Sequence, residues 1–395
     1  MNFQIKLYNE GNTSFYAPNL KNYRIPQDAP VFYNPKMEFN RDFSIIIVQN
    51  YQKQINEKIS ICDPLSGIGI RGIRYGNEVD GVKSIIINDI NKDAYNLIKK
   101  NIDFLNLGSI IEVFNTDANY LLEKISISPY RLDVLDIDPF GSPVTFLDSG
   151  IRSLKKKGLM MLTATDMQVL SGINIKACVR KYGGYPLRNT YSHEIAVRLL
   201  LGCLTRIAGR FNYSIKPLVS FSKIHYIRTF CELNHSITQA NNSINNLGYI
   251  LHCFSCDERI IIHGLNSQIS KNCPNCNNSN VRIAGPLWLG NIQNKQFLSY
   301  ILKNMPSKKF KNMNEIQELL IKLNEEAEMP PTFYNIHEIC KKLKTSPPKF
   351  DMIIDILRKN NYLVSRTHFC SLCIKTDANI TKISELIQKI INEND

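Results

Sequence analysis

Asp138, Pro139 and Phe140 combine three features that suit chemistry on a flat nitrogen base. The apolar run 132–137 precedes them and predicts a buried strand. Ligands bind at the carboxyl ends of the strands in an open α/β sheet, where these residues would lie. A carboxylate there could accept a hydrogen bond from a base amino group, with the aromatic ring stacked on the base. A solvated Asp-Pro turn is the alternative interpretation of the tripeptide taken alone.

A glycine-rich turn joins the first predicted strand to a helix. The strand at 58–62 ends at Asp63, and Gly67, Gly69 and Gly72 follow. Their spacing matches the dinucleotide-binding fingerprint, and Asp89 lies about where a ribose-binding acid is expected. A nicotinamide-dependent dehydrogenase is therefore one alternative for this turn.

Three acidic positions favour S-adenosylmethionine over a nicotinamide cofactor. Asp63 precedes the glycines, which suits a cationic or amino-bearing ligand better than a pyrophosphate. Asp117 follows the third predicted strand, where it could meet an adenine amino group. Asp138 follows the fourth, where methylases that act on exocyclic amines keep their reactive site. We expect Asp136 to be a buried support, because strand alternation points it the same way as Asp138, one pleat deeper.

Strand and helix patterns alternate through the first half of the chain. Helical spacing runs over 92–105, and the strands are expected at 58–62, 84–88, 110–114, 132–137 and 158–163. This alternation predicts a parallel, doubly wound α/β sheet. We expect three segments: an N-terminal segment 1–50, the α/β domain 51–235, and an α+β C-terminal domain 236–395.

These motifs carry a family resemblance that covers nearly the whole chain. The segments 63–72 and 136–143 resemble those of the tRNA guanine-26 N2-dimethyltransferases, and further matching segments lie at 31–35, 40–42, 163–166, 191–194, 225–228 and 365–369. The resemblance implies a Rossmann-like class I methyltransferase that converts guanine-26 of tRNA to N2,N2-dimethylguanosine with S-adenosyl-L-methionine. An N-methyltransferase for another RNA or DNA base amine, and a catalytically silent tRNA-binding protein, are the alternatives.

The resemblance also assigns roles to individual residues. It implies that Arg41, Arg71, Asp89, Asp117 and Ala118 contact the methyl donor. Since Arg41 lies outside the predicted sheet, the segment 1–50 would fold back over the cofactor.

Two CxxC pairs predict a zinc site. Cys253 and Cys256 are separated by sixteen residues from Cys273 and Cys276, a spacing that resembles a zinc ribbon within about 250–280. Four thiolates leave no open coordination position, so the metal should be structural. We expect His252 and His263 to be bystanders. Cys370 and Cys373 form a third CxxC that has no partner pair and could be redox-labile.

The last part of the chain resembles a winged helix. Helical patterns over 335–343 and 349–360 flank a turn at 345–348, and 363–369 reads as a wing strand. Such modules often touch nucleic-acid backbones, although packing against protein is an alternative. An amphipathic, solvated helix is expected before it, at 315–328.

Charge predicts a polyanionic partner. The formal net charge of the 395 residues is +13, and 152–235 alone holds seven Lys, seven Arg and three acids. Phosphate neutralisation together with stacking aromatics would suit tRNA, and the interleaved aromatics are Tyr182, Tyr185, Tyr191, Phe211, Tyr213, Phe221, Tyr226 and Phe230. A solvated basic face with these rings in the core is the alternative. No apolar run approaches the ~18 residues of a membrane span, so we expect a cytoplasmic protein, with a monomer favoured.

Overall fold

The computed structural model describes residues 3–223, 225–305 and 310–393. The chain forms two compact units, each built from separate stretches of sequence. Unit 1 comprises Met1–Ala164, Phe230–His235 and Ser299–Leu320, and unit 2 comprises Thr165–Thr229, Ser236–Leu298 and Ile321–Asp395. Among the described residues, no helix is long and apolar enough to cross a membrane.

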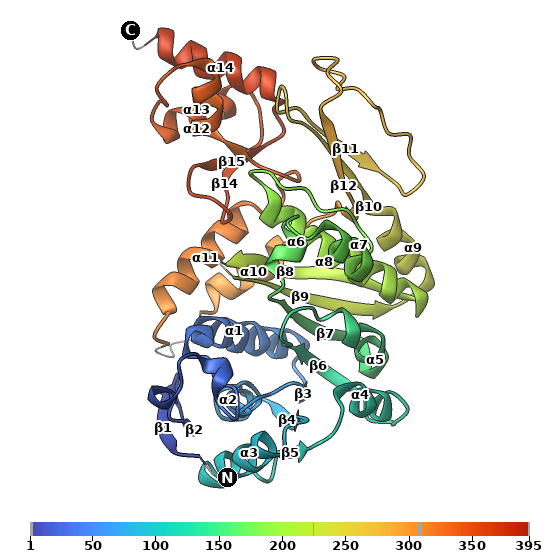
Figure 1. Cartoon of the computed structure of the whole chain (residues 1–395), viewed down its shortest axis with the longest axis vertical. Coiled ribbons are helices and arrows are strands. Elements are labelled where there is room, and N and C mark those ends of the chain that lie inside the picture. Colours follow the sequence, from blue (N-terminus) through green and yellow to red (C-terminus); the bar gives the residue numbers. More distant parts are fainter. Residues whose placement is uncertain (1–2, 224, 306–309, 394–395) are drawn as a thin grey trace. The chain divides into compact units, whose positions relative to one another are not determined.

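A seven-stranded sheet in the order β5-β4-β3-β6-β7-β9-β8 is the main element of the fold (Figure 1). Its first five strands pair in parallel. The strands are β3 (Ile59–Asp63), β4 (Val82–Asn88), β5 (Ile111–Phe114), β6 (Leu132–Ile137), β7 (Leu154–Ala164), β8 (Tyr213–Lys223) and β9 (Tyr226–His235). From β3 the chain adds β4 and β5 on one side, and it then adds β6 and β7 on the other side of β3. The point between β3 and β6 is therefore the topological switch point, where open α/β sheets bind ligands. The predicted Rossmann-like α/β class is thereby confirmed.

Two helices of unit 1, α3 and α4, begin at side-chain caps that the sequence supplies. Asn91 accepts hydrogen bonds from the amides of Asp93 and Ala94 at the start of α3, and Asp117 accepts one from Tyr120 at the start of α4. Both caps satisfy backbone donors that a helix N-terminus leaves unpaired. The helices are α1 (Glu38–Ile55), α2 (Ile70–Glu78), α3 (Lys92–Phe104), α4 (Ala118–Ser126) and α5 (Leu147–Ser153), and α10 (Lys295–Lys303) belongs to unit 1 from Ser299 onward.

An N-terminal hairpin of β1 (Ile5–Glu10) and β2 (Thr13–Pro18) packs against α2 and α3 (Figure 1). Phe15 and Ala17 of β2 are fully buried in one apolar cluster with Tyr33, Ile70 and Leu97. This burial fixes the hairpin beside the glycine turn that opens α2.

Unit 2 centres on α8 (Ser192–Arg210), which packs on β8 and β12. β12 (Val281–Trp288) belongs to an antiparallel three-stranded sheet with β10 (Leu247–Cys253) and β11 (Arg259–His263). We call this sheet the knuckle sheet, because both CxxC pairs are attached to it. Shorter helices are α6 (Met167–Leu170), α7 (Ile175–Tyr182) and α9 (Ile237–Asn245).

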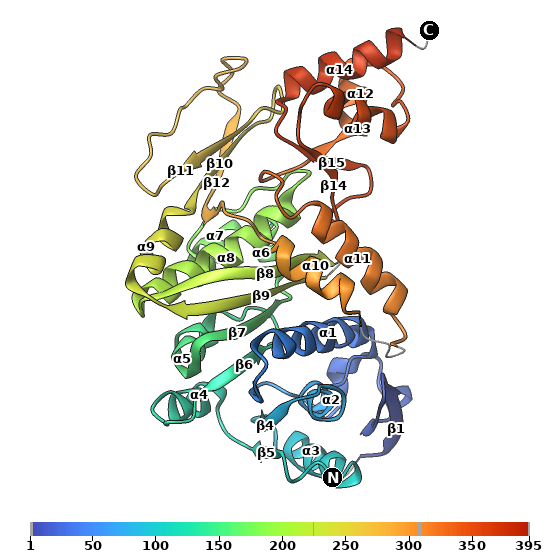
Figure 2. The ribbon, with the colours of Figure 1, turned by 180° about the vertical axis from the view of Figure 1, so that it is seen from behind.

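The C-terminal module of unit 2 has the predicted helix-turn-helix-strand order (Figure 2). Its helices are α12 (Ile336–Leu343), α13 (Phe350–Lys359) and α14 (Ile380–Asn392), and its sheet, in the order β13-β15-β14, contains β13 (Tyr334–Asn335), β14 (Val364–Arg366) and β15 (Cys373–Thr376). Ile339, Leu357, Ile374 and Ile387 join these elements in one core. The helix expected at 315–328 is α11 (Met313–Glu325), and Ile316, Leu320 and Leu323 on one face of it are fully buried, so it is less solvated than predicted.

Candidate active site and metal centre

Four aspartates follow successive parallel strands at one edge of the sheet. Asp63 ends β3, Asp89 follows β4, Asp117 precedes α4 after β5, and Asp138 follows β6. Because the carboxyl ends of parallel strands share an edge, the fold brings these residues to one edge of the sheet, as the sequence predicted, with Asp63 and Asp138 on either side of the switch point.

The glycine turn closes tightly over this edge. Gly67 and Gly69 have φ of +58° and +79°, in the left-handed region that side chains rarely adopt. A Cβ on Gly67 would lie 2.8 Å from the carbonyl oxygen of Phe32. The Asp89 carboxylate accepts hydrogen bonds from the amides of Gly67, at 2.7 Å, and Asn91, at 2.9 Å. The acid after β4 therefore fixes the shape of the turn, and burial raises its pKa.

Asp63 lacks a partner for one of its oxygens. Its Oδ2 accepts from the amide of Gly72 at 3.2 Å, whereas the buried Oδ1 has no hydrogen-bond partner among the described residues. Burial and the nearby Asp136 raise its pKa to about 7. A buried carboxylate of this kind would be stabilised by a cationic ligand, so the site fits a sulfonium methyl donor that also carries an ammonium group.

Asp138 is held by a buried arginine. The Arg71 guanidinium donates through Nη2 to Asp138 Oδ2 and through Nη1 to Asn40 Oδ1, at 2.9 Å. It also lies 3.5 Å from Asp136 Oδ2, and Asp136 is fully buried and accepts a 2.6 Å hydrogen bond from the Tyr75 hydroxyl. Asp136 is thus the buried support that alternation predicted. The side chain of Asp138 stays 21% exposed, so it alone of these two carboxylates reaches solvent.

The side chain of Phe140 is exposed to solvent and lies next to the ring of Phe32. Its side chain is 71% exposed, and its ring centroid lies 4.6 Å from that of Phe32 in an edge-to-face arrangement. Pro139 connects this ring to Asp138. The sequence analysis did not single out Phe32, although it lies within the segment 31–35 that carried part of the family resemblance.

Arg41 belongs to a buried charge network in unit 1. Its guanidinium pairs with Glu10, with Nε 2.7 Å from Oε2, and donates to the Asn34 carbonyl at 3.0 Å. Glu10 also accepts from the Tyr33 hydroxyl at 2.9 Å and lies 3.4 Å from Arg74. Burial opposes the charge on Glu10, but Arg41 and Arg74 outweigh it and lower the pKa of this carboxyl. No sequence signal pointed to Glu10.

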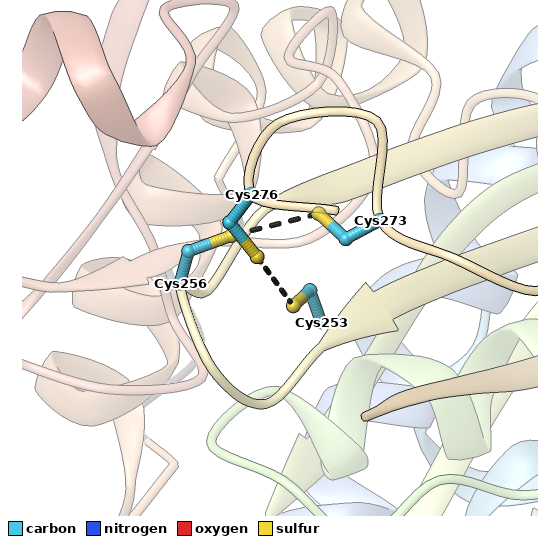
Figure 3. Close-up of side chains that lie close together, drawn as sticks. All are labelled: Cys253, Cys256, Cys273 and Cys276. Carbon is cyan, nitrogen blue, oxygen red and sulfur yellow. Dashed lines mark hydrogen bonds between the residues drawn. The ribbon is translucent and has the colours of Figure 1, made fainter. Parts of the chain in front are cut away.

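The four cysteines of the two CxxC pairs converge (Figure 3). All four Sγ atoms lie within 4.8 Å of one another, with 3.6 Å between Cys253 and Cys276 and between Cys256 and Cys273. Four sulfurs about 2.3 Å from one zinc ion would have such separations. Burial raises the pKa of Cys253, but backbone amides of Cys256 and Ser255 that donate to its sulfur outweigh burial and lower this pKa to about 7. The donor set and its spacing therefore fit tetrahedral zinc.

Known proteins resemble this chain over its whole length. The family model of N2,N2-dimethylguanosine tRNA methyltransferases matches residues 11–388. The chain belongs to this family. The tRNA (guanine(26)-N(2))-dimethyltransferases of Methanobrevibacter smithii and Methanothermobacter thermautotrophicus are 39% and 38% identical to it, over 99% and 98% of this chain and 99% of each relative.

A solved structure of the family has the same fold. Trm1 from Pyrococcus horikoshii, in complex with S-adenosyl-L-methionine, superposes with a TM-score of 0.85 at 32% identity. The match covers 97% of this chain and 99% of that one. The family predicted from the sequence motifs is confirmed.

The aromatic side chains of the basic segment 152–235 are mostly buried, which differs from the expectation that they stack on bases. Six of the eight aromatics proposed as stacking platforms are buried. They lie at the end of α7, just before α8, and on β8 and β9, and they are Tyr182, Tyr191, Tyr213, Phe221, Tyr226 and Phe230. Tyr185 is 54% exposed. Stacking by the six buried rings was therefore a wrong interpretation, and the core alternative holds for them.

The cations of that segment divide into two groups. Arg198 and Arg228 are buried, and Arg198 pairs with Glu194 on α8. The exposed cations include Lys155, Lys156, Arg180, Lys181 and Arg188. Less positive charge reaches the surface than the sequence count suggests, and two of these five cations pair with carboxylates, Lys155 with Asp133 and Lys181 with Asp166.

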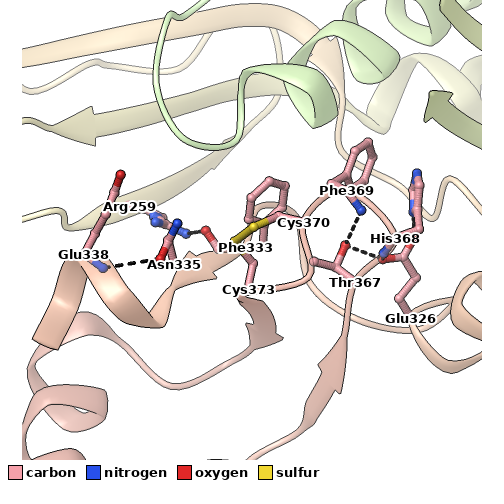
Figure 4. The surroundings of a disulfide bond; sticks show 10 residues. All are labelled: Arg259, Glu326, Phe333, Asn335, Glu338, Thr367, His368, Phe369, Cys370 and Cys373. Carbon is pink, nitrogen blue, oxygen red and sulfur yellow. Dashed lines mark hydrogen bonds and ion pairs between the residues drawn. A yellow bond between two sulfur atoms is a disulfide. The ribbon is translucent and has the colours of Figure 1, made fainter. Parts of the chain in front are cut away.

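The third CxxC forms a disulfide between Cys370 and Cys373, the first residue of β15 (Figure 4). Close by, Glu326 accepts hydrogen bonds from the hydroxyl of Thr367, at 2.6 Å, and from the ring of His368. Glu326 and His368 are both about 1% exposed, so the turn that carries the disulfide is fixed by hydrogen bonds to a buried carboxyl group.

Proposed function

We propose that this chain methylates N2 of guanine-26 in tRNA with S-adenosyl-L-methionine as donor and gives N2,N2-dimethylguanosine. Asp138 carries the proposal, because it is a partly exposed carboxylate at the switch point whose position is fixed by buried Arg71. The activity named for its full-length relatives and the donor in the Trm1 complex support the same reaction.

The donor would lie along the edge formed by β3, β4 and β5. The residues proposed to hold it are Asp63, Gly67, Gly69, Asp89, Asp117 and Ala118, and the resemblance adds Arg41 and Arg71. When bound, the donor supplies a methyl group already activated on a positively charged sulfur. The unpartnered Oδ1 of Asp63 supports binding of a cation here. Glu10 holds the guanidinium of Arg41 in one position. Any contact of Arg41 with the donor would therefore come from a guanidinium of fixed position.

Asp138 would act directly on the base. The N2 lone pair of guanine is delocalised into the ring, so the amine is a poor nucleophile. A carboxylate that accepts from N2–H localises this pair and takes the proton as the N–C bond forms and the S–C bond breaks. Arg71 holds Oδ2 and so orients the second oxygen toward the base. Alignment of the two reactants would supply much of the rate gain.

Phe140 would receive the target base. In folded tRNA this base must leave its stack before chemistry can reach N2. An aromatic ring that is 71% exposed, next to the catalytic carboxylate, offers a face for the extruded guanine, and Phe32 lies at its edge.

The remaining elements would bind the rest of the tRNA. The exposed cations of 152–235 suit phosphates, and residues 236–395 form the proposed tRNA-binding domain, stabilised by zinc on Cys253, Cys256, Cys273 and Cys276. We place the protein in the cytoplasm and favour a monomer.

Mass analysis of nucleosides from tRNA incubated with protein and donor tests this function. N2,N2-dimethylguanosine, lost when Asp138 is replaced by Ala, is the expected result. A different methylated nucleoside would indicate another base amine as the substrate. A wild-type protein that binds tRNA but yields no methylated base would indicate a silent tRNA-binding protein.

A further inference from the structure

A cavity of about 140 Å³ lies in unit 2, far in sequence from the methyl-transfer residues. The knuckle sheet, the loop at 189–190 and the start of α12 enclose it. His252, Tyr334 and Ile339 form a buried floor, with exposed fractions of 3, 6 and 4%. Thr190 and Glu338 are exposed at its rim. It is therefore a recess that opens to solvent.

Two buried polar atoms of the lining have no partner among the described residues. They are Nε of Arg259 and Nδ1 of His252. The rest of the Arg259 guanidinium is fixed: Nη1 donates to the Phe333 carbonyl, and the group lies over the rings of Tyr334, at 3.8 Å, and Tyr191, at 4.5 Å (Figure 4 shows Arg259 with Phe333 and Glu338). Buried polar atoms are nearly always hydrogen-bonded. The pair thus indicates a ligand with hydrogen-bonding groups along one edge.

The charge of the cavity argues against a phosphate. Arg259 is its one cation among the lining residues, whereas Asp257 and Glu338 supply two carboxylates. Lys342 pairs with Asp257 from outside the lining. A phosphate would gain one guanidinium and meet two negative groups. A neutral group avoids this repulsion.

The side chains that line the cavity, and its volume, suit a small and flat ligand. The ring of Phe254 is 38% exposed and lies edge-to-face with His252, at 4.5 Å, while Ile339 and Ile380 add apolar surface. The volume is below the ~300–1,000 Å³ of sites for drug-sized ligands. Proteins that recognise unpaired RNA bases combine such apolar contacts with hydrogen bonds to the base edge.

We propose that this cavity receives one unpaired nucleobase of the RNA substrate, other than the guanine that is methylated. That the partner is RNA rests on the proposed function, whereas the size and chemistry of the cavity do not. Exposed cations flank it, because Arg188 adjoins Asn189 in the chain and Lys341 lies on α12. They would hold the phosphates on either side of the inserted base.

The substitution His252→Phe tests the proposal, because it keeps a ring of similar shape and removes both ring nitrogens. The dissociation constant of the full-length, zinc-loaded protein for tRNA is measured at several salt concentrations. We expect it to rise about three- to tenfold, as for the loss of one or two hydrogen bonds. The log–log salt slope should not change, because no phosphate contact is lost. His263→Phe, which alters an exposed histidine of the same sheet, is the matched control and should bind as the wild type does.

Three results would overturn the proposal. They are an unchanged dissociation constant, an equal loss in the control, and a salt slope that falls by about one, which marks a phosphate contact. Zinc content and melting temperature report whether His252→Phe is folded.

A second measurement needs no substitution. Wild-type protein is cross-linked to tRNA that carries photoreactive thio-bases in place of uridine or guanine. Cross-links in the peptides around 189–190 and 252–259, from an unpaired nucleotide other than position 26, would support the cavity. Cross-links only elsewhere, on tRNA that is methylated normally, would remove this inference and leave the proposed function intact. Absence of methylation would instead count against the function.

Discussion

Replacing Asp138 with Asn should separate catalysis from donor binding. Asn has nearly the same volume, and its Oδ1 can still accept the hydrogen bond from Arg71, so the geometry at the end of β6 should persist. What is lost is the negative charge and the ability to take a proton from N2. Proton transfer by a positioned side chain contributes typically ~10²–10⁴-fold to a rate, which corresponds to about 2.7–5.5 kcal/mol of activation free energy. We expect a loss of methyl transfer in this range.

Stability should change much less. Arg71 keeps Asn40 at 2.9 Å and Asp136 at 3.5 Å in the variant. Since Asp138 is 21% exposed, its ion pair is partly screened, and we expect the free energy of unfolding to fall by only about 1–2 kcal/mol.

Single-turnover methyl transfer with saturating tRNA gives the rate, and calorimetry gives donor affinity. Asp133→Asn is the matched control, because Asp133 lies near the opposite end of β6 and pairs with the exposed Lys155. It should leave both quantities unchanged. If Asp138→Asn weakens donor binding as much as it slows transfer, Asp138 acts on the donor, and the reasoning from the base amine is refuted.

Four further outcomes follow from the site. Asp89→Ala should weaken donor binding by about 1–3 kcal/mol, and unchanged affinity in calorimetry would place the ribose elsewhere. Affinity for tRNA should fall steeply with salt, and Arg188→Gln should reduce the log–log slope by about one; a flat wild-type plot would contradict phosphate binding by the basic segment. Cys253→Ser should lower zinc content, melting temperature and tRNA affinity while donor affinity persists, whereas a zinc-free, fully active enzyme would remove the structural role of the metal. The pKa of Asp63 rises from 3.8 to about 7 on folding, so its contribution to stability is present below pH 4 and is lost as pH rises to 7; urea melts of Asp63→Asn should show a smaller decline over this window, and identical pH profiles would argue against the shift.

Local patterns in the sequence were enough to place the main candidate site residues at one edge of the sheet. Apolar runs that end in Asp63, Asp89 and Asp138 fixed both the strands and the sheet edge at which they meet, because parallel strands share one carboxyl end. The two CxxC pairs predicted a cluster because each pair is a local turn. Asp257 and Asn277, which follow them, both adopt positive φ, so the two turns are alike.

Contacts between segments that are distant in the chain could not be predicted from local sequence patterns. The pairs Arg71–Asp138 and Arg41–Glu10 join residues separated by 67 and 31 positions, and nothing local marks them as partners. The prediction that the aromatic rings of the basic segment stack on bases was wrong for a related reason. Composition reports that rings and cations alternate, but burial depends on which face of its helix or strand each ring occupies, as on α7, β8 and β9.

The discontinuity of unit 1 bears on how the protein is made. Phe230 of β9 packs on Phe43 of α1, and Asn312 donates a 2.9 Å hydrogen bond to the buried Asp42. Unit 1 therefore draws on parts of the chain that are synthesised well after β7 ends at Ala164, and the last of them, around Asn312, follows roughly 150 residues later, or about 8 to 30 seconds at common elongation rates. Through that interval its buried carboxylates and apolar faces lack their late partners, and a gene truncated after residue 164 would encode a half that never acquires them.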